Sequence, residues 1–365
     1  MTFKLGELFC GPGGIGLGAA LSKIESETGT FEIKHAWATD YDKHTCDTYI
    51  KNICAGDKRT VVCEDIRKLD YNVLKEISEI DALAFGFPCN DFSVVGEQKG
   101  INGSFGPLYT YGVKALNLFR PKWFLAENVG GLRNSNEGSA LKIILDELYN
   151  SGYSLYPHLY KFEEYGVPQS RRRIIIIGIR EDIDISFAVP STVPWAAADT
   201  SCRTALENPP IAPDTPNNEL TRQSKNVVER LKHIKPGQNA FTADLPAHLQ
   251  LNIKGARISQ IYKRLDPDKP AYTVTGSGGG GTHVYHWAEN RALTNRERAR
   301  LQTFPDNFIF CGPKESVRRQ IGMAVPVNGV KIIFDAVLKS FAGIEYETAE
   351  PYFQPMVLRA EQAVF

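Results

Sequence analysis

Apolar and polar positions follow two rhythms in the first half of the chain, short apolar runs and longer amphipathic stretches. The short runs predict strands, and helical patterns such as Ser139 to Asn150 fill several intervals between them. The predicted strands cover 4–9, 33–39, 61–63, 82–86, 123–127 and 174–179. Strands that alternate with helices are typical of β-α-β units, so we predict a doubly wound α/β domain with a parallel sheet over residues 1–188.

This rhythm stops after Pro190, where the chain becomes rich in Pro, Ala, Asn and Thr. We therefore expect a second, smaller domain over 189–287. Helical patterning resumes where Thr294 caps the segment NRERARLQTF, and an apolar stripe follows over 327–341. We expect 288–315 to form a hinge and 316–365 to return to the first domain.

The composition is that of a soluble globular protein. Of the 365 residues, 42% are hydrophobic and 23% are charged, which argues against disorder, and no apolar run reaches the ~18 residues of a membrane span. The first residues lack the basic and apolar pattern of an export signal, so we expect a cytoplasmic protein without a membrane partner. The seven cysteines form no C-x-x-C pair, which disfavours a disulfide framework and a zinc site. We expect free thiols and no bound metal.

Charge is distributed unevenly, although the formal net charge is zero. Nine Lys or Arg residues between Arg222 and Arg264 face two acids, Glu229 and Asp244, so this stretch carries a charge of about +7. We expect a local basic surface, which either binds DNA or is a solvated face. The glycine run at 278–281 lies nearby, between TVT and VYHW. It either lets the backbone approach a partner closely or forms a flexible hairpin tip.

A glycine loop follows the first predicted strand. Residues 11–16, GPGGIG, satisfy G-x-G-x-x-G, and Asp40 stands at the end of the next strand, where a carboxylate can bind ribose hydroxyls. This pattern suits a dinucleotide-binding dehydrogenase as well as a protein that binds S-adenosylmethionine. A dehydrogenase, however, has no use for a Pro-Cys at one strand end, Glu-Asn at the next and Gln-x-Arg-x-Arg later in the chain.

Six motifs together resemble the cytosine-5 DNA methyltransferase family of bacterial or phage restriction-modification systems. They occur in the family's order, cover most of the chain and read LFCGPGG, GFPCNDFS, ENV, QSRRR, RALTNRERARLQTFPD and IGMAVPVNG. The basic segment and the glycine run lie where that family has its target-recognition domain. The resemblance therefore implies a methyltransferase fold with an inserted recognition domain, S-adenosylmethionine as cofactor and double-stranded DNA as substrate.

Cys89 is the candidate nucleophile. Cytosine C5 is a poor nucleophile, so methylation requires a temporary bond to C6, and a thiolate suits that addition. Cys89 follows an apolar strand and Pro88, which would hold the sulfur at a carboxyl strand edge; a lone cysteine can also be a buried apolar filler. Glu127 ends the strand WFLAE and can act as the acid at cytosine N3, whereas elsewhere such a glutamate is merely solvated.

Arg171 and Arg173 alternate within SRRRIIII, so we expect them on one face of a strand start and Arg172 on the other. The resemblance implies that this pair contacts cytosine O2, a flanking phosphate or the catalytic glutamate. A basic strand edge that deters aggregation is the alternative. Between Asn90 and Pro107 lies a long stretch with four glycines, which we expect to close over a flipped base.

The resemblance also assigns the cofactor and DNA contacts. It gives Phe9 to the adenine, Gly11 and Gly13 to a tight turn, Asp40 to the ribose, and Asp65 with Ile66 to the adenine edge. Further cofactor residues are Gly14, Tyr41, Pro88, Leu108 and Val325. The expected DNA contacts are Lys254, Arg257, Gly278, Gly279 and Thr282.

Four positions depart from the family pattern. Asn90 replaces the usual Gln and is followed by Asp91, Arg172 replaces a Glu, and Met323 replaces an Asn. The first three are expected to be peripheral, whereas Met323 puts in doubt a polar contact of the last motif.

Two other functions share these motifs. A transfer RNA methyltransferase would use the same chemistry, but the roughly 100 residues between QSRRR and RALTNRE are ample for a DNA-recognition domain. A catalytically inactive DNA-binding regulator is disfavoured because the cysteine, the glutamate and both arginines are present. We expect a monomer that works beside a cognate restriction endonuclease.

Overall fold

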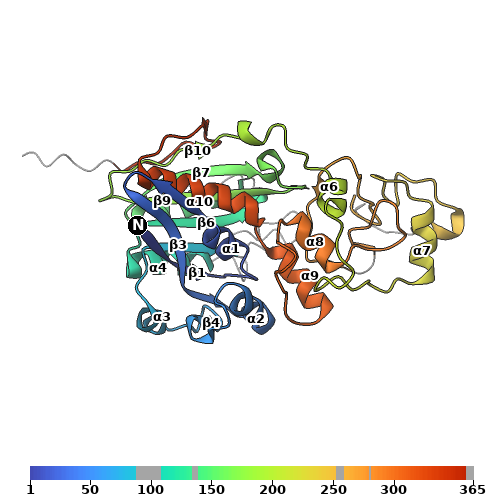
Figure 1. Cartoon of the computed structure of the whole chain (residues 1–365), viewed down its shortest axis with the longest axis horizontal. Coiled ribbons are helices and arrows are strands. Elements are labelled where there is room, and N and C mark those ends of the chain that lie inside the picture. The colour runs from blue at the N-terminus through green and yellow to red at the C-terminus, as the bar shows by residue number, and fades with distance from the viewer. Residues whose placement is uncertain (88–107, 134–138, 252–258, 279–280, 359–365) are drawn as a thin grey trace, which may run out of the picture. The chain divides into compact units, whose positions relative to one another are not determined.

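The computed structural model describes residues 1–87, 108–133, 139–251, 259–278 and 281–358. The chain forms two compact units (Figure 1). Unit 1 contains Met1–Lys161, Arg172–Pro194 and Gly329–Phe365, and unit 2 contains Phe162–Arg171 and Trp195–Asn328.

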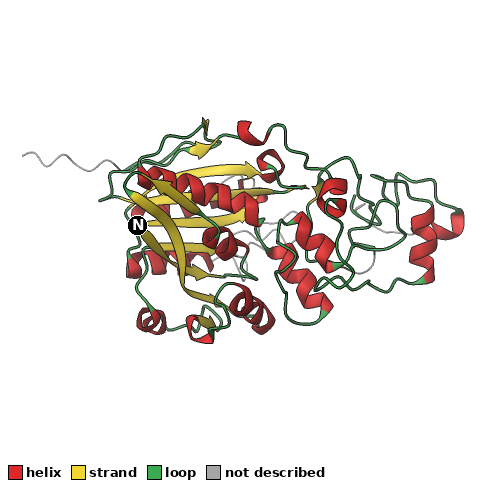
Figure 2. Ribbon diagram, in the orientation of Figure 1, coloured by secondary structure: helices red, strands yellow, loops and turns green. Residues whose placement is uncertain are grey.

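An eight-stranded sheet forms the centre of unit 1 (Figure 2), in the order β2-β3-β1-β5-β6-β9-β7 with β4 paired to β3. The strands are β1 (Thr2–Leu8), β2 (Lys23–Ser26), β3 (Gly29–Asp40), β4 (Val61–Cys63), β5 (Ala82–Gly86), β6 (Trp123–Val129), β7 (Tyr153–Lys161) and β9 (Arg172–Arg180). Strands β4, β3, β1, β5 and β6 run parallel, whereas β9, β7 and β2 are antiparallel to their neighbours.

Helices cover both faces of this sheet. On one face, α3 (Tyr71–Ile77), α4 (Tyr109–Phe119) and α5 (Ser139–Asn150) share a buried core with Phe85 and Phe124. Trp123, one residue before Phe124, points to the other face, because side chains alternate along a strand. There it packs against Phe334 of α10 (Val327–Ala342), with ring centroids 5.8 Å apart. The apolar runs of the sequence therefore become a sheet buried on both sides.

The expected doubly wound α/β architecture is confirmed, and the expected parallel sheet is mixed, because β2, β7 and β9 pair antiparallel with their neighbours. Each predicted strand is present, with ends that differ by up to four residues, and α5 has the predicted bounds. The sequence analysis missed β7, which pairs with β9 along Tyr153–Lys161. Antiparallel pairing of β9 with both β6 and β7 follows from contacts between distant segments, which local periodicity does not report.

Unit 2 contains short elements around a small apolar core. Its helices are α6 (Cys202–Glu207), α7 (Lys225–Lys232), α8 (Asn295–Leu301) and α9 (Lys314–Met323), and β8 (Gln169–Ser170) pairs with β11 (Ala271–Tyr272). Leu231, Ile261 and Tyr285 belong to the core cluster. Thr294 caps α8 through a capping box with Glu297, as the sequence predicted. Beside the glycine run, Tyr285 of the VYHW segment forms isolated bridges to Arg264 and Ala292, and the described residues show no hairpin between TVT and VYHW.

The compact units have other boundaries than the expected domains. Residues 195–328 form one compact part together with 162–171, so the segment expected as a hinge, 288–315, belongs to unit 2. One physical reason is the buried side of α8, where Leu301 and Ala299 are fully enclosed. Compactness does not report function, so the proposed roles of 1–188, 189–287, 288–315 and 316–365 stay predictions.

One stretch of the described residues, Lys314–Ala342, has the length and hydropathy of a membrane-spanning helix. Of its apolar window, 72% is buried inside the structure, as in the core helices of soluble proteins.

Candidate active site

Several predicted site residues meet at the carboxyl edge of the parallel strands in unit 1. The register aligns Leu8 with Phe85 and with Thr39, and Gly86 with Glu127. Loops that follow β1, β3, β5 and β6 therefore leave the sheet side by side. Ligands of open α/β sheets bind at this edge.

Glu127 and Arg173 form an ion pair at this edge, with 2.7 Å between Arg173 Nε and Glu127 Oε1. Both side chains are 12% exposed. Arg173 lies on β9, the antiparallel neighbour of β6, opposite Val129 of β6. Glu127 and Arg173 are therefore diagonal cross-strand neighbours. The guanidinium also donates to Arg172 O at 2.8 Å, and these contacts hold the carboxylate in one position.

Gly86 gives the Glu127 carboxylate room. A Cβ at position 86 would lie 3.1 Å from Glu127 Oε2, which is tighter than ordinary side-chain contact. The buried Asn128 connects the two strand ends, because its amide donates to Phe87 O at 3.4 Å and its oxygen accepts from Val129 N at 2.8 Å. Pro88 and Cys89 follow Phe87 directly and lie outside the described residues, as does the expected lid over 90–107.

The glycine loop makes a tight turn after β1. Phe9, Gly11 and Gly13 have φ values of 54°, 54° and 98°, the left-handed region that favours glycine. Gly13 N donates to Cys10 O at 3.2 Å, and Gly14 begins α1 (Gly14–Ala20). No heavy atom of the described residues lies within 4 Å of the Cβ position at Gly11, so the described part of the chain leaves this side of the turn open.

Asp40 is held against this turn. Its Oδ2 accepts from Gly11 N at 3.1 Å and its Oδ1 from Asp42 N at 3.0 Å. Burial raises the pKa of the Asp40 carboxyl above its ordinary value, and the main-chain hydrogen bonds partly oppose that shift. A carboxylate has about four acceptor positions, so two main-chain donors leave capacity for a ligand's hydroxyl groups.

The other predicted cofactor residues differ in accessibility. The Tyr41 side chain is 75% exposed, and Asp65 is ion-paired to Arg67, whose side-chain hydrogen bonds lower the Asp65 pKa to about 2. Ile66 and Leu108 are both buried in the core cluster of unit 1. Val325 is buried and belongs to unit 2.

The sequence analysis expected Arg171 and Arg173 on one face of a strand start. The structure does not place Arg171 on that strand. Strand β9 begins at Arg172, and Arg171 belongs to unit 2, so strand alternation does not relate the two arginines. The Arg171 side chain is 1% exposed and donates to Val274 O at 3.0 Å and to Gly322 O at 2.9 Å. These contacts favour a structural role for Arg171, whereas Arg173 contacts the candidate catalytic carboxylate.

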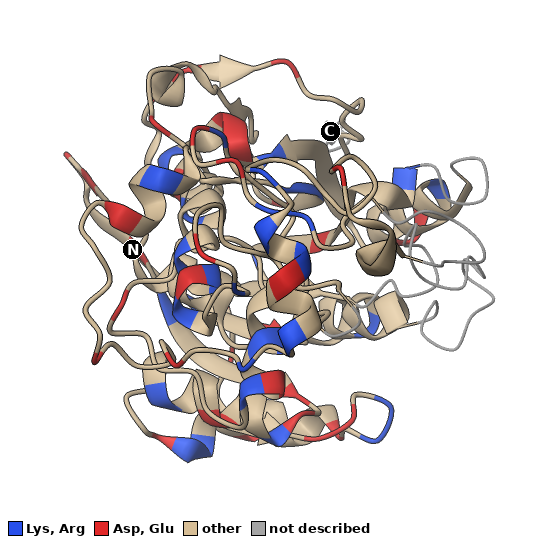
Figure 3. Ribbon diagram, turned by 90° about the vertical axis from the view of Figure 1, so that its right-hand side faces the viewer, with Lys and Arg blue, Asp and Glu red and all other residues tan. Residues whose placement is uncertain are grey.

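Of the expected DNA contacts, Lys254, Arg257 and Gly279 lie outside the described residues, while Gly278 and Thr282 belong to unit 2. The expected basic surface between residues 222 and 264 is only partly correct. Arg264 is 3% exposed and donates to four main-chain oxygens, including His286 O at 2.7 Å. Over the described chain as a whole, basic and acidic residues are interspersed along the ribbon (Figure 3).

Glu7 is a buried residue that the sequence analysis missed. It lies on β1 with 1% exposure, and Tyr49 of α2 (Lys43–Asn52) donates to its Oε2 at 2.9 Å. Burial raises the Glu7 pKa to about 8. A Cβ at Gly16 would lie 2.9 Å from the same oxygen, so this carboxyl packs directly beneath the glycine loop. The only sequence signal was an acid inside the apolar run LGELF.

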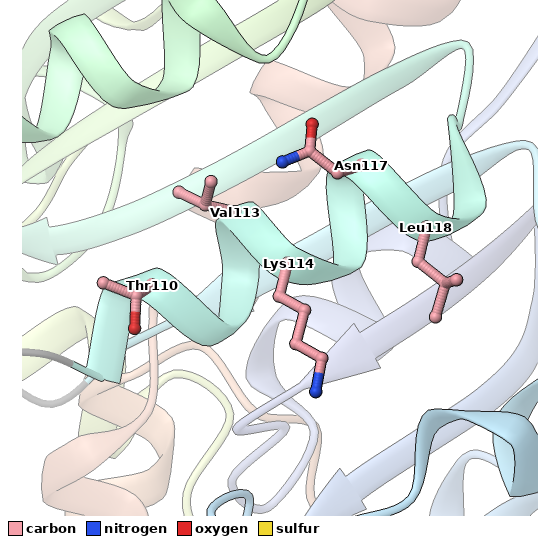
Figure 4. A pocket seen from close by; sticks show the side chains of 5 residues that line it. All are labelled: Thr110, Val113, Lys114, Asn117 and Leu118. Atoms are coloured by element: carbon pink, nitrogen blue, oxygen red, sulfur yellow. The ribbon is translucent and has the colours of Figure 1, made fainter.

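A hollow of about 500 Å³ lies elsewhere on unit 1 (Figure 4). It is lined by Thr110, Val113, Lys114, Asn117 and Leu118, which all come from the single helix α4. None of the predicted catalytic and cofactor residues that the structure describes lines it, so the hollow gives no support to the candidate active site.

The chain is similar to several known proteins. The model of the family described as C-5 cytosine-specific DNA methylase matches residues 3–339. The chain is 56% identical to the type II methyltransferase M.BbvI of Brevibacillus brevis, over 100% of this chain and 98% of the relative. It is 38% identical to M.NgoFVII of Neisseria gonorrhoeae, over 93% and 87%. The solved structure of the Schizosaccharomyces pombe Dnmt2 methyltransferase matches at 17% identity with a TM-score of 0.61, covering 92% and 98%.

Proposed function

Because this chain belongs to the family of C-5 cytosine-specific DNA methylases, we propose that it flips its target cytosine out of the duplex and bonds Cys89 to cytosine C6. The chain is a DNA (cytosine-5-)-methyltransferase of the restriction-modification type.

Base flipping follows from the geometry of the substrate. C5 and C6 of a stacked cytosine are shielded by neighbouring bases, so the nucleotide must leave the stack to meet a nucleophile and a methyl donor. Unstacking costs a few kcal/mol. Contacts to the extruded base and to the DNA backbone offset this cost. We propose that the carboxyl edge of β5 and β6 receives the base.

Cys89 is the proposed nucleophile because of its place in the chain. Gly86 lies beside Glu127 in the strand register, and Cys89 follows Gly86 by three residues. The thiolate adds to C6, the ring becomes an enamine, and C5 gains a methyl group. The C5 proton then leaves to a base and the electron pair of the C5–H bond expels the thiolate, which restores the aromatic ring and the free cysteine.

Glu127 is the proposed acid at cytosine N3, and Arg173 is its positioning residue. Addition of the thiolate places negative charge on the ring, which a proton at N3 neutralises. The 2.7 Å contact with Arg173 fixes the direction of the carboxyl group, so its second oxygen can face the base. A proton shared between Glu127 and N3 then balances the charge of the adduct.

The cofactor is proposed to be S-adenosylmethionine, which supplies an electrophilic methyl group. The site fits its ribose, because Asp40 combines an anchored carboxylate with the open side of the turn at Gly11. Phe9, at the end of β1, would lie against the adenine, and Asp65 with Ile66 would contact its edge. Gly13 keeps the turn close to α2, where a Cβ would lie 3.0 Å from Ile53.

The second part of the chain is proposed to read the DNA sequence. We assign target recognition to residues 189–287, with Lys254, Arg257, Gly278, Gly279 and Thr282 as contacts, because this stretch lies between the arginine motif and RALTNRE. A chimera that takes this segment from a relative of known target should take on the relative's target. We also propose a cytoplasmic monomer that works beside a cognate endonuclease.

The observation that carries the proposal is the Glu127–Arg173 pair beside Gly86. Trapping tests it. Duplex DNA with 5-fluorocytosine at the target should stop the enzyme after one methyl transfer, because fluorine cannot leave C5 as a cation. The adduct should survive denaturation and require S-adenosylmethionine.

Cys89→Ser should abolish the adduct, whereas Cys63→Ser, a matched change at an exposed cysteine, should not. An active preparation that forms no denaturation-resistant complex with matched DNA would rule out the covalent mechanism. An adduct only with fluorinated RNA would instead reassign the substrate.

A further inference from the structure

Among the described residues, no carboxylate forms an ion pair with Arg298, a buried cation of unit 2. Arg298, on α8, is 1% exposed, and its Nη1 has no hydrogen-bond partner among the described residues. Burial is the main cause that lowers the pKa of Arg298 to about 10. The neighbouring acid Glu297 is already ion-paired to Arg291 at 2.8 Å. An unbalanced buried charge destabilises a fold, so its retention calls for a function.

His283 extends this cation towards the glycine run. Arg298 Nη2 lies 3.3 Å from His283 Nδ1, and because arginine can only donate, Nδ1 accepts and the ring proton is on Nε2. Burial, together with Arg298 and Arg318, lowers the His283 pKa to about 4. The ring is therefore neutral at neutral pH and offers one N–H donor, which suits an oxyanion.

Arg318, on α9, completes the cluster. Its Nε donates to Gly276 O at 3.4 Å, a long contact that leaves most of the guanidinium's donors for other partners. The side chain is half-buried, and Arg319 beside it is exposed. Glu315 is the one carboxylate whose charge acts on both His283 and Arg318, so the cluster stays positive overall.

Glycines bring the main chain directly onto these cations. A Cβ at Gly278 would lie 2.4 Å from Arg318 Nε and 2.9 Å from His283 Cε1. A Cβ at Gly322 would lie 1.9 Å from Gly276 N, so α9 and the segment meet backbone to backbone. Glycines let the main chain approach a ligand closely, and a bound anion could meet the arginine and histidine donors that lie beside this main chain.

We propose that Arg298, His283 and Arg318 form a site for one backbone phosphodiester of the bound DNA. Arg318 and the His283 N–H contact the phosphate oxygens, and Arg298 adds the positive charge behind them. Arginine suits phosphate because its planar donors match two oxygens. The inference rests on DNA being the substrate and adds residues outside 189–287 to the recognition surface.

Salt dependence of DNA binding tests this site. The probe is a duplex that carries the target, located by sequencing the methylated cytosines in DNA from expressing cells. The plot of log Kobs against log salt has a negative slope. Arg318→Gln should make this slope shallower by about 1, the change expected for one lost phosphate contact. Target choice should stay the same, because a phosphate contact carries no direct sequence information. Arg203→Gln is the control, an exposed arginine of unit 2 paired to Asp268 at 3.2 Å.

An unchanged slope in Arg318→Gln overturns the proposal. An altered target sequence would also overturn it, because Arg318 would then contact a base rather than a phosphate. Arg298→Met provides a second test. The thermal midpoint of the DNA-free variant should stay equal or rise, because the unbalanced charge is gone, while DNA affinity falls. A lower midpoint with unchanged affinity would make Arg298 a core residue only. Methylation by the wild type is recorded first, so failure of the proposed function is seen separately.

Discussion

Arg173 reaches Glu127 across two antiparallel strands, with 2.7 Å between Nε and Oε1, whereas Arg171, two residues earlier, donates to Val274 O and Gly322 O. Two arginines of one motif thus have different partners. The first holds the candidate catalytic carboxylate, and the second holds two segments of unit 2 together. Their substitutions should therefore fail in different ways.

Arg173→Gln should lower kcat by about tenfold to a hundredfold, because Glu127 loses the group that directs it. Binding of S-adenosylmethionine should stay within about twofold, since Asp40 and the turn at Gly11 are untouched. Single-turnover methylation and equilibrium cofactor binding measure the two effects. Arg172→Gln, at the exposed neighbouring position, is the matched control. Equal losses in both variants would contradict a specific role for Arg173.

Glu127→Gln should slow the chemical step by about a hundredfold or more, because an amide cannot transfer a proton to N3. Cofactor and DNA affinities should change little. The amide keeps the shape of the carboxylate and fits beside Gly86, so folding should be preserved. Rapid-quench methylation under single-turnover conditions measures the step. If S-adenosylmethionine affinity fell instead, Glu127 would belong to the cofactor site.

Arg171→Lys should lower the free energy of unfolding by about 1–3 kcal/mol, because one ammonium cannot replace both buried hydrogen bonds. Urea denaturation measures this loss, with Arg172→Lys as control. Well below the unfolding transition, kcat should remain close to that of the wild type. A large loss of kcat in the fully folded variant would instead support the catalytic role expected from the sequence.

Glu7→Gln should change how stability depends on pH. The unfolded chain releases the Glu7 proton near pH 4.5, whereas the folded protein holds it to about pH 8. The free energy of unfolding therefore falls as pH rises between these values, by a few kcal/mol at most, on the order expected from the shift. Glutamine cannot ionise and should remove this fall. Urea midpoints at pH 5 to 9 measure it, and curves of equal slope for both proteins would refute the buried acid.

Local patterns predicted much of the unit 1 sheet. Strands such as Ala82–Gly86 and helix Ser139–Asn150 have the predicted bounds, because burial on both faces produces apolar runs and helical stripes. The partners of β9 could not be predicted, since strand pairing depends on contacts between distant segments. The expected face shared by Arg171 and Arg173 failed for a related reason, because the strand begins between them.

The charged residues were harder to predict than the fold. Arg264 counts as a surface charge in the sequence but is buried among main-chain oxygens. Arg298 lies in the run RERAR, where neither spacing nor composition distinguishes a buried cation from a solvated one. The place of Glu127 near the end of an apolar strand, by contrast, was predictable, while its catalytic role stays a prediction.

The backbone contact between Gly276 and Gly322 sets a condition for engineering new specificities. Neither position has room for a Cβ, so the two main-chain segments must keep the shapes and the separation that let them pack backbone to backbone. In a chimera that joins a transplanted recognition segment to a foreign α9, the equivalents of Gly276 and Gly322 come from different parents. Nothing then ensures that the two segments pack together. Crossovers placed after Gly322, so that both glycines come from one parent, should yield more folded chimeras than crossovers at residue 287.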